Sequence, residues 1–218
     1  MAINVKKLVY KIRFKIGDLD EVRYSDFDVL EAVNDCIRYL NQDKALKNSD
    51  FLEKIKHYDQ NEMNAEVAAY NELHPTEPKE FYNFPVTGAE MPEDLIALVD
   101  LVRLKDGYHL HPIPAVEQIN PYEQGQYKII NDRIYANTDF DMLYRAEIAT
   151  VSLTDLNNAD SIIELPAVFT ELLAKIAVMI LLNQAETDVM MREISRITDY
   201  LISGRRYNNI KVRMPFKV

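Results

Sequence analysis

The 218-residue sequence has no tryptophan, one cysteine, five glycines and four histidines. A single cysteine, Cys36, excludes an intrachain disulfide and any zinc site built on several cysteines. The five glycines are isolated from one another, so the sequence has no glycine-rich phosphate loop. Patterns typical of serine hydrolases, zinc proteases and EF-hand loops are also missing. We therefore predict that the protein is not an enzyme and needs no cofactor or metal.

Long hydrophobic runs are missing as well. The longest, IAVMILL at residues 176–182, is far shorter than the roughly 20 residues that span a bilayer. The first 16 residues have basic side chains spread through them and no uninterrupted apolar segment, which argues against a signal peptide. Apolar residues still make up 48% of the chain, enough for a core. We expect no membrane partner.

The charges are distributed unevenly. The net charge is −10, yet residues 1–16 and 204–218 each carry five Lys or Arg and no acid. Residues 17–94 carry 19 acids against 7 bases. The basic ends are either solvated surface or contacts for an acidic partner. Because the body is acidic, sequence-specific DNA binding is not expected. Lys6, Lys7 and Lys11 are either phosphate contacts or the solvated face of the first predicted helix.

Helical spacing dominates the first half of the chain. Residues 4–16 form a predicted amphipathic helix that ends at Gly17 and Asp18. Ser25 or Asp26 can cap a second helix, and the two should form an αα-hairpin. Residues 49–73 are predicted as a helical arm, and the four prolines of residues 75–92 indicate an irregular connector.

The period then changes to two, which predicts strands. Expected strands are residues 98–104, 108–114, 127–130, 133–135 and 142–153, with turns at Gly107 and at Asn131–Asp132. Residues 114–120 are expected to form one short helix, and residues 155–164 a polar loop.

The last third is predicted to be helical up to Gly204. Pro166 suits the first turn of an apolar, central helix, and a final helix over residues 187–203 should stop at Gly204. The predicted fold class is α+β, mainly α: a helical bundle with an inserted small antiparallel sheet and an extended C-terminal tail. We assign residues 1–204 to a single domain, with a polar excursion at 45–95 and a β insertion at 96–155, and residues 205–218 to the tail.

Few side chains have spacings that indicate chemistry, and each has a structural alternative. His109 and His111 would share one face of a strand, but no third metal ligand follows at a recognisable spacing. The acids Asp18, Asp20 and Glu21 lie in a loop where acids also begin the next helix, and Asp139 and Asp141 are expected as turn residues. Cys36 lies mid-helix without a nearby base, as a structural cysteine does.

Two segments resemble the head-to-tail adaptor proteins of tailed bacteriophages. In RFKIGDLDEVRYSDFDVLEAVNDCIRYLNQ, the matching residues are Gly17, Asp18, Asp26, Leu30 and Asn34. In the later block of strands followed by an "LP" helix start, they are Leu165, Pro166, Leu172 and Ala174. The segment 45–95 is longer and more polar than a minimal adaptor requires.

The resemblance implies a dodecameric ring in the virion neck, made in the host cytoplasm, that joins portal to tail and lines the DNA exit channel. The partners would be the portal, tail or neck proteins, further copies of the chain, and passing DNA. The tail would contact the portal or a neighbouring subunit, for example by adding a strand to a sheet; its expected contact residues are Arg205, Arg206, Tyr207, Ile210, Lys211, Val212, Arg213 and Phe216. The alternatives are a cytoplasmic oligomeric protein-interaction module without catalysis and, third, an enzyme with a carboxylate site.

Overall fold

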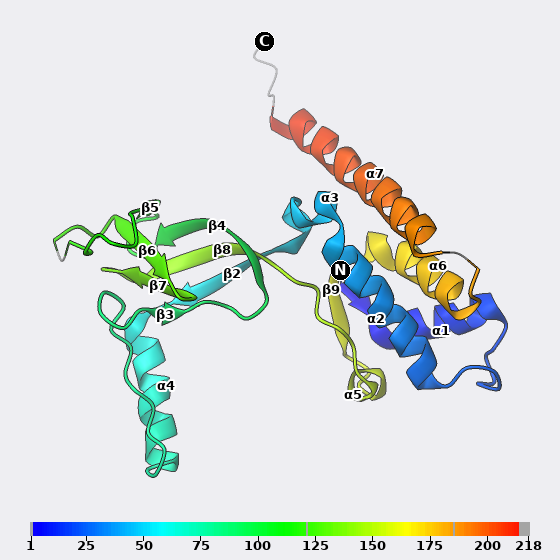
Figure 1. The fold of residues 1–218 in the computed structure, drawn as a ribbon, viewed down its shortest axis with the longest axis horizontal. Coiled ribbons are helices and arrows are strands. Elements are labelled where there is room, and N and C mark those ends of the chain that lie inside the picture. Colours follow the sequence, from blue (N-terminus) through cyan, green and yellow to red (C-terminus); the bar gives the residue numbers. More distant parts are fainter. Residues whose placement is uncertain (1, 121, 185, 214–218) are drawn as a thin grey trace. The chain divides into compact units, whose positions relative to one another are not determined.

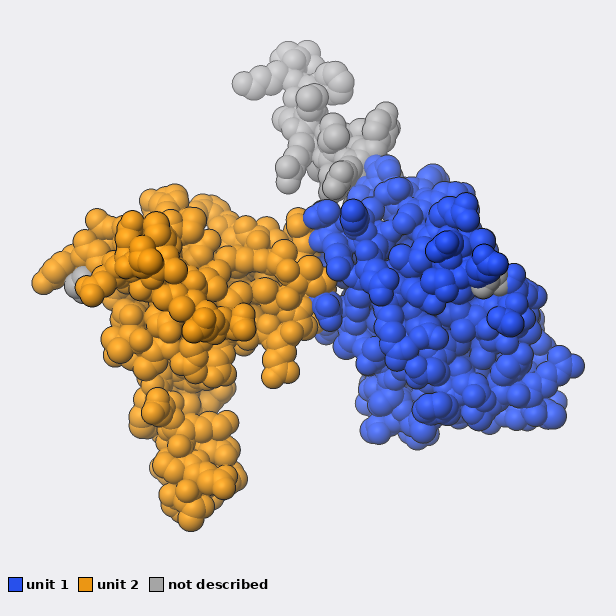
Figure 2. Space-filling view, in the orientation of Figure 1, with its two compact units in different colours: residues 1–52, 147–218 blue, residues 53–146 orange. Residues whose placement is uncertain are grey.

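The computed structural model describes residues 2–120, 122–184 and 186–213, with side chains up to residue 203 (Figure 1). The chain divides into two compact units (Figure 2). The helical unit comprises Met1–Leu52 and Glu147–Val218, and the sheet unit comprises Glu53–Ala146. The predicted class, α+β and mainly α, is confirmed.

The unit boundaries differ from the predicted single domain 1–204 with its β insertion at 96–155. The sheet unit begins at Glu53 because β2 (Glu53–Tyr58) pairs along its whole length with β8 (Phe140–Ala146). The predicted helix over 49–73 is therefore wrong for β2 and right for α4 (Gln60–Leu73). The strand predicted over 142–153 also ends early, at Ala146.

The helical unit opens with β1 (Ala2–Asn4), α1 (Val5–Ile16) and α2 (Asp26–Gln42), which confirms the predicted helix pair. Gly17 ends α1 in the left-handed conformation, with φ of 68°, which glycine adopts without strain. Ser25 caps α2 through a capping box with Asp28. Two short helices, α3 (Lys44–Lys47) and the 3-10 helix η1 (Asp50–Leu52), follow.

The second half of the helical unit contains α5 (Leu153–Asn157), β9 (Ile162–Pro166), the 3-10 helix η2 (Ala167–Phe169), α6 (Thr170–Leu181) and α7 (Thr187–Arg213). α6 packs against α1, α2 and α7, which confirms it as the central helix. Pro166 is not in its first turn, because β9 pairs antiparallel with β1 and Pro166 ends that strand. Residues 155–164, predicted as a loop, are therefore partly helix and strand.

The predicted helix stop at Gly204 is wrong. α7 continues to Arg213, so residues 205–213 are helical and not extended. A glycine inside a helix costs only about 1 kcal/mol relative to alanine, which neighbouring helix-forming residues can offset. Within the predicted contact set, the side chains of Arg205 to Arg213 and the whole of Phe216 lie outside the described part of the chain.

The sheet unit contains two sheets. One has the strand order β2-β8-β4, with β4 at Leu95–Arg103. The other has the order β3-β7-β6-β5, formed by Ala89–Glu90, Arg133–Ala136, Gln126–Ile130 and His111–Pro112. All pairs are antiparallel except β5 with β6. The predicted short helix at 114–120 is absent, since residues 114–120 form one turn and otherwise irregular backbone.

A tight turn joins two strands of the second sheet, and one core holds the two sheets together. Asn131 and Asp132 join β6 to β7 with φ of 48° and 59°, as a type I′ hairpin requires. Both sheets contribute to a core that includes a three-ring cluster, in which the rings of Tyr58 and Phe140 stack 4.8 Å apart beside Phe84. Figure 1 shows α4 extending away from these strands.

Candidate interaction surfaces

The loop between α1 and α2 is held by a buried arginine and a buried aspartate. Asp18 accepts hydrogen bonds from the backbone N–H groups of Val22, Arg23 and Tyr24 at 2.9–3.0 Å. Arg13, only 3% exposed, donates to the Tyr24 carbonyl at 3.0 Å and forms an ion pair with Asp26 at 2.6 Å. Gly17 and Asp18, which match the adaptor pattern, therefore shape the turn between α1 and α2.

The pKa of Asp18 reflects this hydrogen bonding. Burial acts to raise the pKa of Asp18, but the backbone N–H groups of Arg23, Tyr24 and Val22 and the charge of Arg13 outweigh it, so the net pKa is lowered. Glu21 lies 3.8 Å from Arg13. These partners favour the structural interpretation of the Asp18, Asp20 and Glu21 group over a cation site.

Two asparagines on α2 fasten the segment that re-enters the helical unit. Asn34 donates to the Val151 carbonyl at 2.9 Å and accepts from the Val151 N–H at 2.8 Å. Asn41 makes the same pair of bonds to Ile148, both at 3.0 Å. Seven helical residues rise about 10.5 Å, and three extended residues span about 10 Å. The two spacings match, so residues 148–151 run antiparallel alongside α2 and bond to it at both ends.

The same arrangement recurs on α4. Asn64 exchanges two hydrogen bonds with the backbone of Tyr82, at 2.6 and 2.9 Å, and Asn71 exchanges two with Lys79, at 2.7 and 2.9 Å. The asparagines are again seven residues apart and their partners three apart. Helix α4 and the returning residues 74–82 thus form one hydrogen-bonded unit, which we call the arm.

The arm is acidic and largely solvent-exposed. On α4 only Val67 is buried, and Leu73 at its end is 78% exposed. Its charged residues are Glu62, Glu66, Glu72, Glu77, Glu80 and Lys79. The Lys79 ammonium lies 4.1 Å from the centre of the Tyr70 ring, a cation–π contact. The arm therefore presents a net negative surface.

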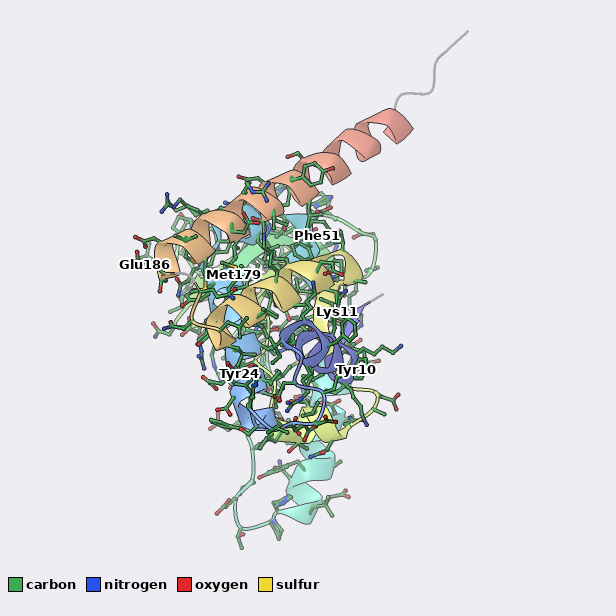
Figure 3. All side chains as sticks on the ribbon, turned by 90° about the vertical axis from the view of Figure 1, so that its right-hand side faces the viewer. Tyr10, Lys11, Tyr24, Phe51, Met179 and Glu186 are labelled. Carbon is green, nitrogen blue, oxygen red and sulfur yellow. The ribbon has the colours of Figure 1, made fainter. Side chains whose placement is uncertain are left out.

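A second exposed surface is the outer face of α1. Tyr10 and Phe14, one turn apart, are 63% and 67% exposed, and Figure 3 shows Tyr10 and Lys11 on this helix. Lys11 and Lys15 both pair with Glu171 of α6. Lys6 and Lys7, also exposed, have no ion pair within the described residues.

The histidines do not form a shared site. His109 bonds to Asp100 at 2.6 Å, whereas His111 bonds to the Tyr108 hydroxyl at 3.1 Å. No cluster of three or more His, Cys, Asp or Glu side chains able to hold a metal occurs in residues 2–120, 122–184 and 186–213. Within the same ranges, no helix is both long enough and apolar enough to cross a bilayer.

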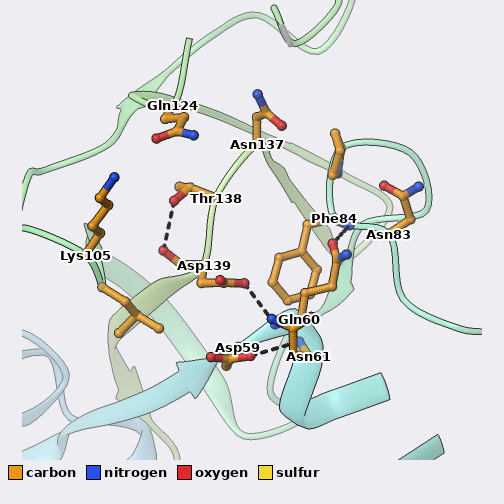
Figure 4. Close-up of a pocket in the computed structure, with 12 residues that line it drawn as sticks. Asp59, Gln60, Asn61, Asn83, Phe84, Lys105, Gln124, Asn137, Thr138 and Asp139 are labelled. Atoms are coloured by element: carbon orange, nitrogen blue, oxygen red, sulfur yellow. Dashed lines mark hydrogen bonds between the residues drawn. The ribbon is translucent and has the colours of Figure 1, made fainter. Parts of the chain in front are cut away.

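A polar pocket of about 570 Å³ lies in the sheet unit at the start of α4 (Figure 4). Asp139 accepts from the backbone N–H of Gln60 at 2.9 Å, and the Gln60 amide accepts from that of Phe84. Asp59 caps α4 through Asn61. These groups hold the surrounding loops, which fits the prediction of Asp139 as a turn residue; Asp141 instead lies in β8 and bonds to His57 at 2.7 Å.

Cys36 is fully buried on α2. Burial raises the pKa of the Cys36 thiol far above its ordinary value, and the charge of Asp35 adds to the effect. The thiol therefore stays protonated, as expected for a structural cysteine.

Sequence reasoning missed the paired asparagines and a buried aspartate, Asp43. Asp43 accepts from Ser195 at 2.7 Å and from Thr198 at 3.1 Å, which ties the start of α3 to α7. The asparagines had a readable signal, the repeated seven-residue spacing within a helix. Asp43 had none, because its partners lie about 150 residues away.

Comparison with known proteins yields no assignment: neither a protein-family model nor a curated protein matches this chain.

Proposed function

We propose that this protein is a head-to-tail adaptor of a tailed bacteriophage, a ring-forming neck protein that joins the portal to the tail and surrounds the DNA exit channel. The proposal is supported first by where the adaptor-like residues lie. Gly17, Asp18, Asp26 and Asn34, together with the helix that follows Pro166, all belong to the helical unit. Gly17, Asp18 and Asp26 shape the turn between α1 and α2, and Asn34 bonds to the returning backbone at Val151. The helix after Pro166 is the central helix α6.

A second support is that the carboxylates suited to chemistry are engaged structurally. Asp18 is held by three backbone N–H groups, Asp139 by Gln60 and Asp141 by His57. Groups with such partners stabilise a fold more readily than they activate a substrate. This favours an assembly role over a carboxylate enzyme.

The long helix α7 changes the expected mode of portal docking. Residues 205–213 are helical, so they cannot add a strand to a partner sheet without first unfolding. We propose instead that the basic end of α7 docks as a helix. An amphipathic helix entering a groove is an established mode of recognition.

Copurification with the portal tests this function. The full chain, mixed with the portal protein of the same genome, is expected to elute with it, and a chain lacking residues 205–218 is expected to bind more weakly. A full chain that remains a small free oligomer beside the portal would indicate the interaction-module alternative.

A further inference from the structure

We propose that the arm of one copy docks on the outer face of α1 of a second copy. The arm stripe is formed by Glu62, Glu66, Ala69 and Leu73. The α1 stripe is formed by Lys6, Lys7, Tyr10 and Phe14. Charge complementarity and matched residue spacing between the two stripes identify a second copy of this chain as the partner.

The arm stripe is a single exposed face. Its residues recur at intervals of four, three and four, so they align on one side of α4. All four are exposed, and neither glutamate has an ion pair within the described residues. The stripe begins with two negative charges and ends in Leu73, whose side chain is 78% exposed.

The α1 stripe has the complementary order. It begins with two exposed lysines and continues to Tyr10 and Phe14. Glu171 neutralises Lys11 and Lys15 beside it, so Lys6 and Lys7 are the positive charges left for a partner. Residues 1–16 contain no acid that would repel the arm.

The spacings agree when the two helices run parallel. Glu66 precedes Leu73 by seven residues, and Lys7 precedes Phe14 by seven, about 10.5 Å in each helix. In this register Glu66 lies opposite Lys7 and Leu73 opposite Phe14, and the small Ala69 leaves room for Tyr10. Glu62 lies one turn before Glu66, on the side of Lys6. The paired asparagines hold the arm in shape before docking, which reduces the entropy lost on binding.

The contact joins two different surfaces, so it is heterologous. A repeated heterologous contact builds a ring when it closes and a filament when it does not. Only this step, the closure into a ring, depends on the proposed adaptor function.

Charge exchange tests the contact. Sedimentation analysis compares the wild type, K6E/K7E, E62K/E66K and the variant carrying all four reversals. Like charges across an interface are strongly unfavourable, so each double reversal should weaken self-association at least about 10-fold. The fourfold variant should recover it to near the wild-type value. Arg23→Glu with Lys44→Glu, which changes the net charge by the same amount as K6E/K7E on other exposed positions of the helical unit, should associate like wild type.

Three results would overturn the inference: a wild type that stays monomeric at its highest soluble concentration, reversals that behave like the control, or a fourfold variant no better than its parents. Reversals that keep self-association but lose the portal would also overturn it, because the occupant would then be another protein. Rings that form and dock despite the reversals would leave the adaptor function standing. Rings or filaments that depend on the charges but ignore the portal would count against the adaptor function alone.

Discussion

At the scale of residues, asparagine has the most specific role. Its amide carries one acceptor and one donor, as a peptide group does, so it can bond both the N–H and the C=O of a single residue. Asn34, Asn41, Asn64 and Asn71 all do this. Asparagine is a mediocre helix former, and here each residue instead fixes a chain segment that lacks strand partners.

Replacing Asn34 by alanine should destabilise the helical unit by about 1–3 kcal/mol, because the buried N–H and C=O of Val151 lose both partners. Urea unfolding of the purified protein measures the change. Asn48→Ala is the matched control, since Asn48 is exposed and its amide makes one local bond to Lys44. Equal effects of the two substitutions would show that the pairing with Val151 contributes nothing.

Asp18 should make stability depend on acidity. Its folded pKa lies below the ordinary value of 3.8, so the ionised carboxylate stabilises the fold above that pH. The contribution is lost as the pH falls through the folded pKa. Asp18→Asn lacks this titration and should lose less stability than the wild type between pH 5 and acid conditions below the folded pKa.

Denaturant midpoints across that range, with Asp20→Asn on the same loop as control, measure the effect of Asp18. If the Asp18→Asn protein loses as much stability in acid as the wild type, the hydrogen bonds to the loop do not set its acid sensitivity.

At the scale of elements, the arm is the most independent piece. Its helix buries only Val67, and the asparagine side chains link that helix to the backbone of residues 79 and 82. It should therefore open locally without global unfolding.

The double substitution Asn64→Ala/Asn71→Ala should speed amide hydrogen exchange in residues 74–82 by at least about 10-fold, which corresponds to roughly 1.4 kcal/mol of lost local stability. The exchange of β8 should not change. Mass spectrometry of peptic peptides reports both segments in one experiment. Unaltered exchange in residues 74–82 would mean that other contacts hold the arm.

Elements fixed by local signals were predicted well. The Ser25 cap, the Gly17 stop and the Asn131–Asp132 turn each depend on neighbouring residues and are confirmed. Elements fixed by distant partners were not predicted. Residues 53–58 have apolar residues at helical spacing but pair with β8, and Pro166 follows a strand paired with the N-terminus. Neither partner is recognisable from the local pattern.

The candidate surfaces, too, could be predicted from the sequence only in part. The basic charge of residues 1–16 and the acidity of the middle were visible in the sequence. That Glu62 and Glu66 lie on one exposed stripe of α4, and that Tyr10 and Phe14 face solvent, required the structure. For residues 205–213 the sequence indicated the opposite, because a glycine is typical of the position just after a helix end, yet α7 continues through Gly204.

At the scale of the whole molecule, we propose that the protein functions by assembling with its own copies and with the portal. Removing residues 205–218 should leave the fold intact, because the apolar side chains of α7 that are buried within residues 187–203 are Met190, Ile194 and Ile202, and the deletion leaves all three in place. Circular dichroism and the thermal midpoint should match those of the full chain within about 2 °C, since surface changes rarely exceed 0.5 kcal/mol. A large drop in the midpoint would mean that the end of α7 belongs to the core.

The most direct test of the central claim is negative-stain electron microscopy of the full chain mixed with the portal protein of the same genome. We expect class averages in which a ring of this protein, expected to have twelve subunits, sits coaxially on the portal ring. Compact particles separate from unoccupied portal rings would contradict it.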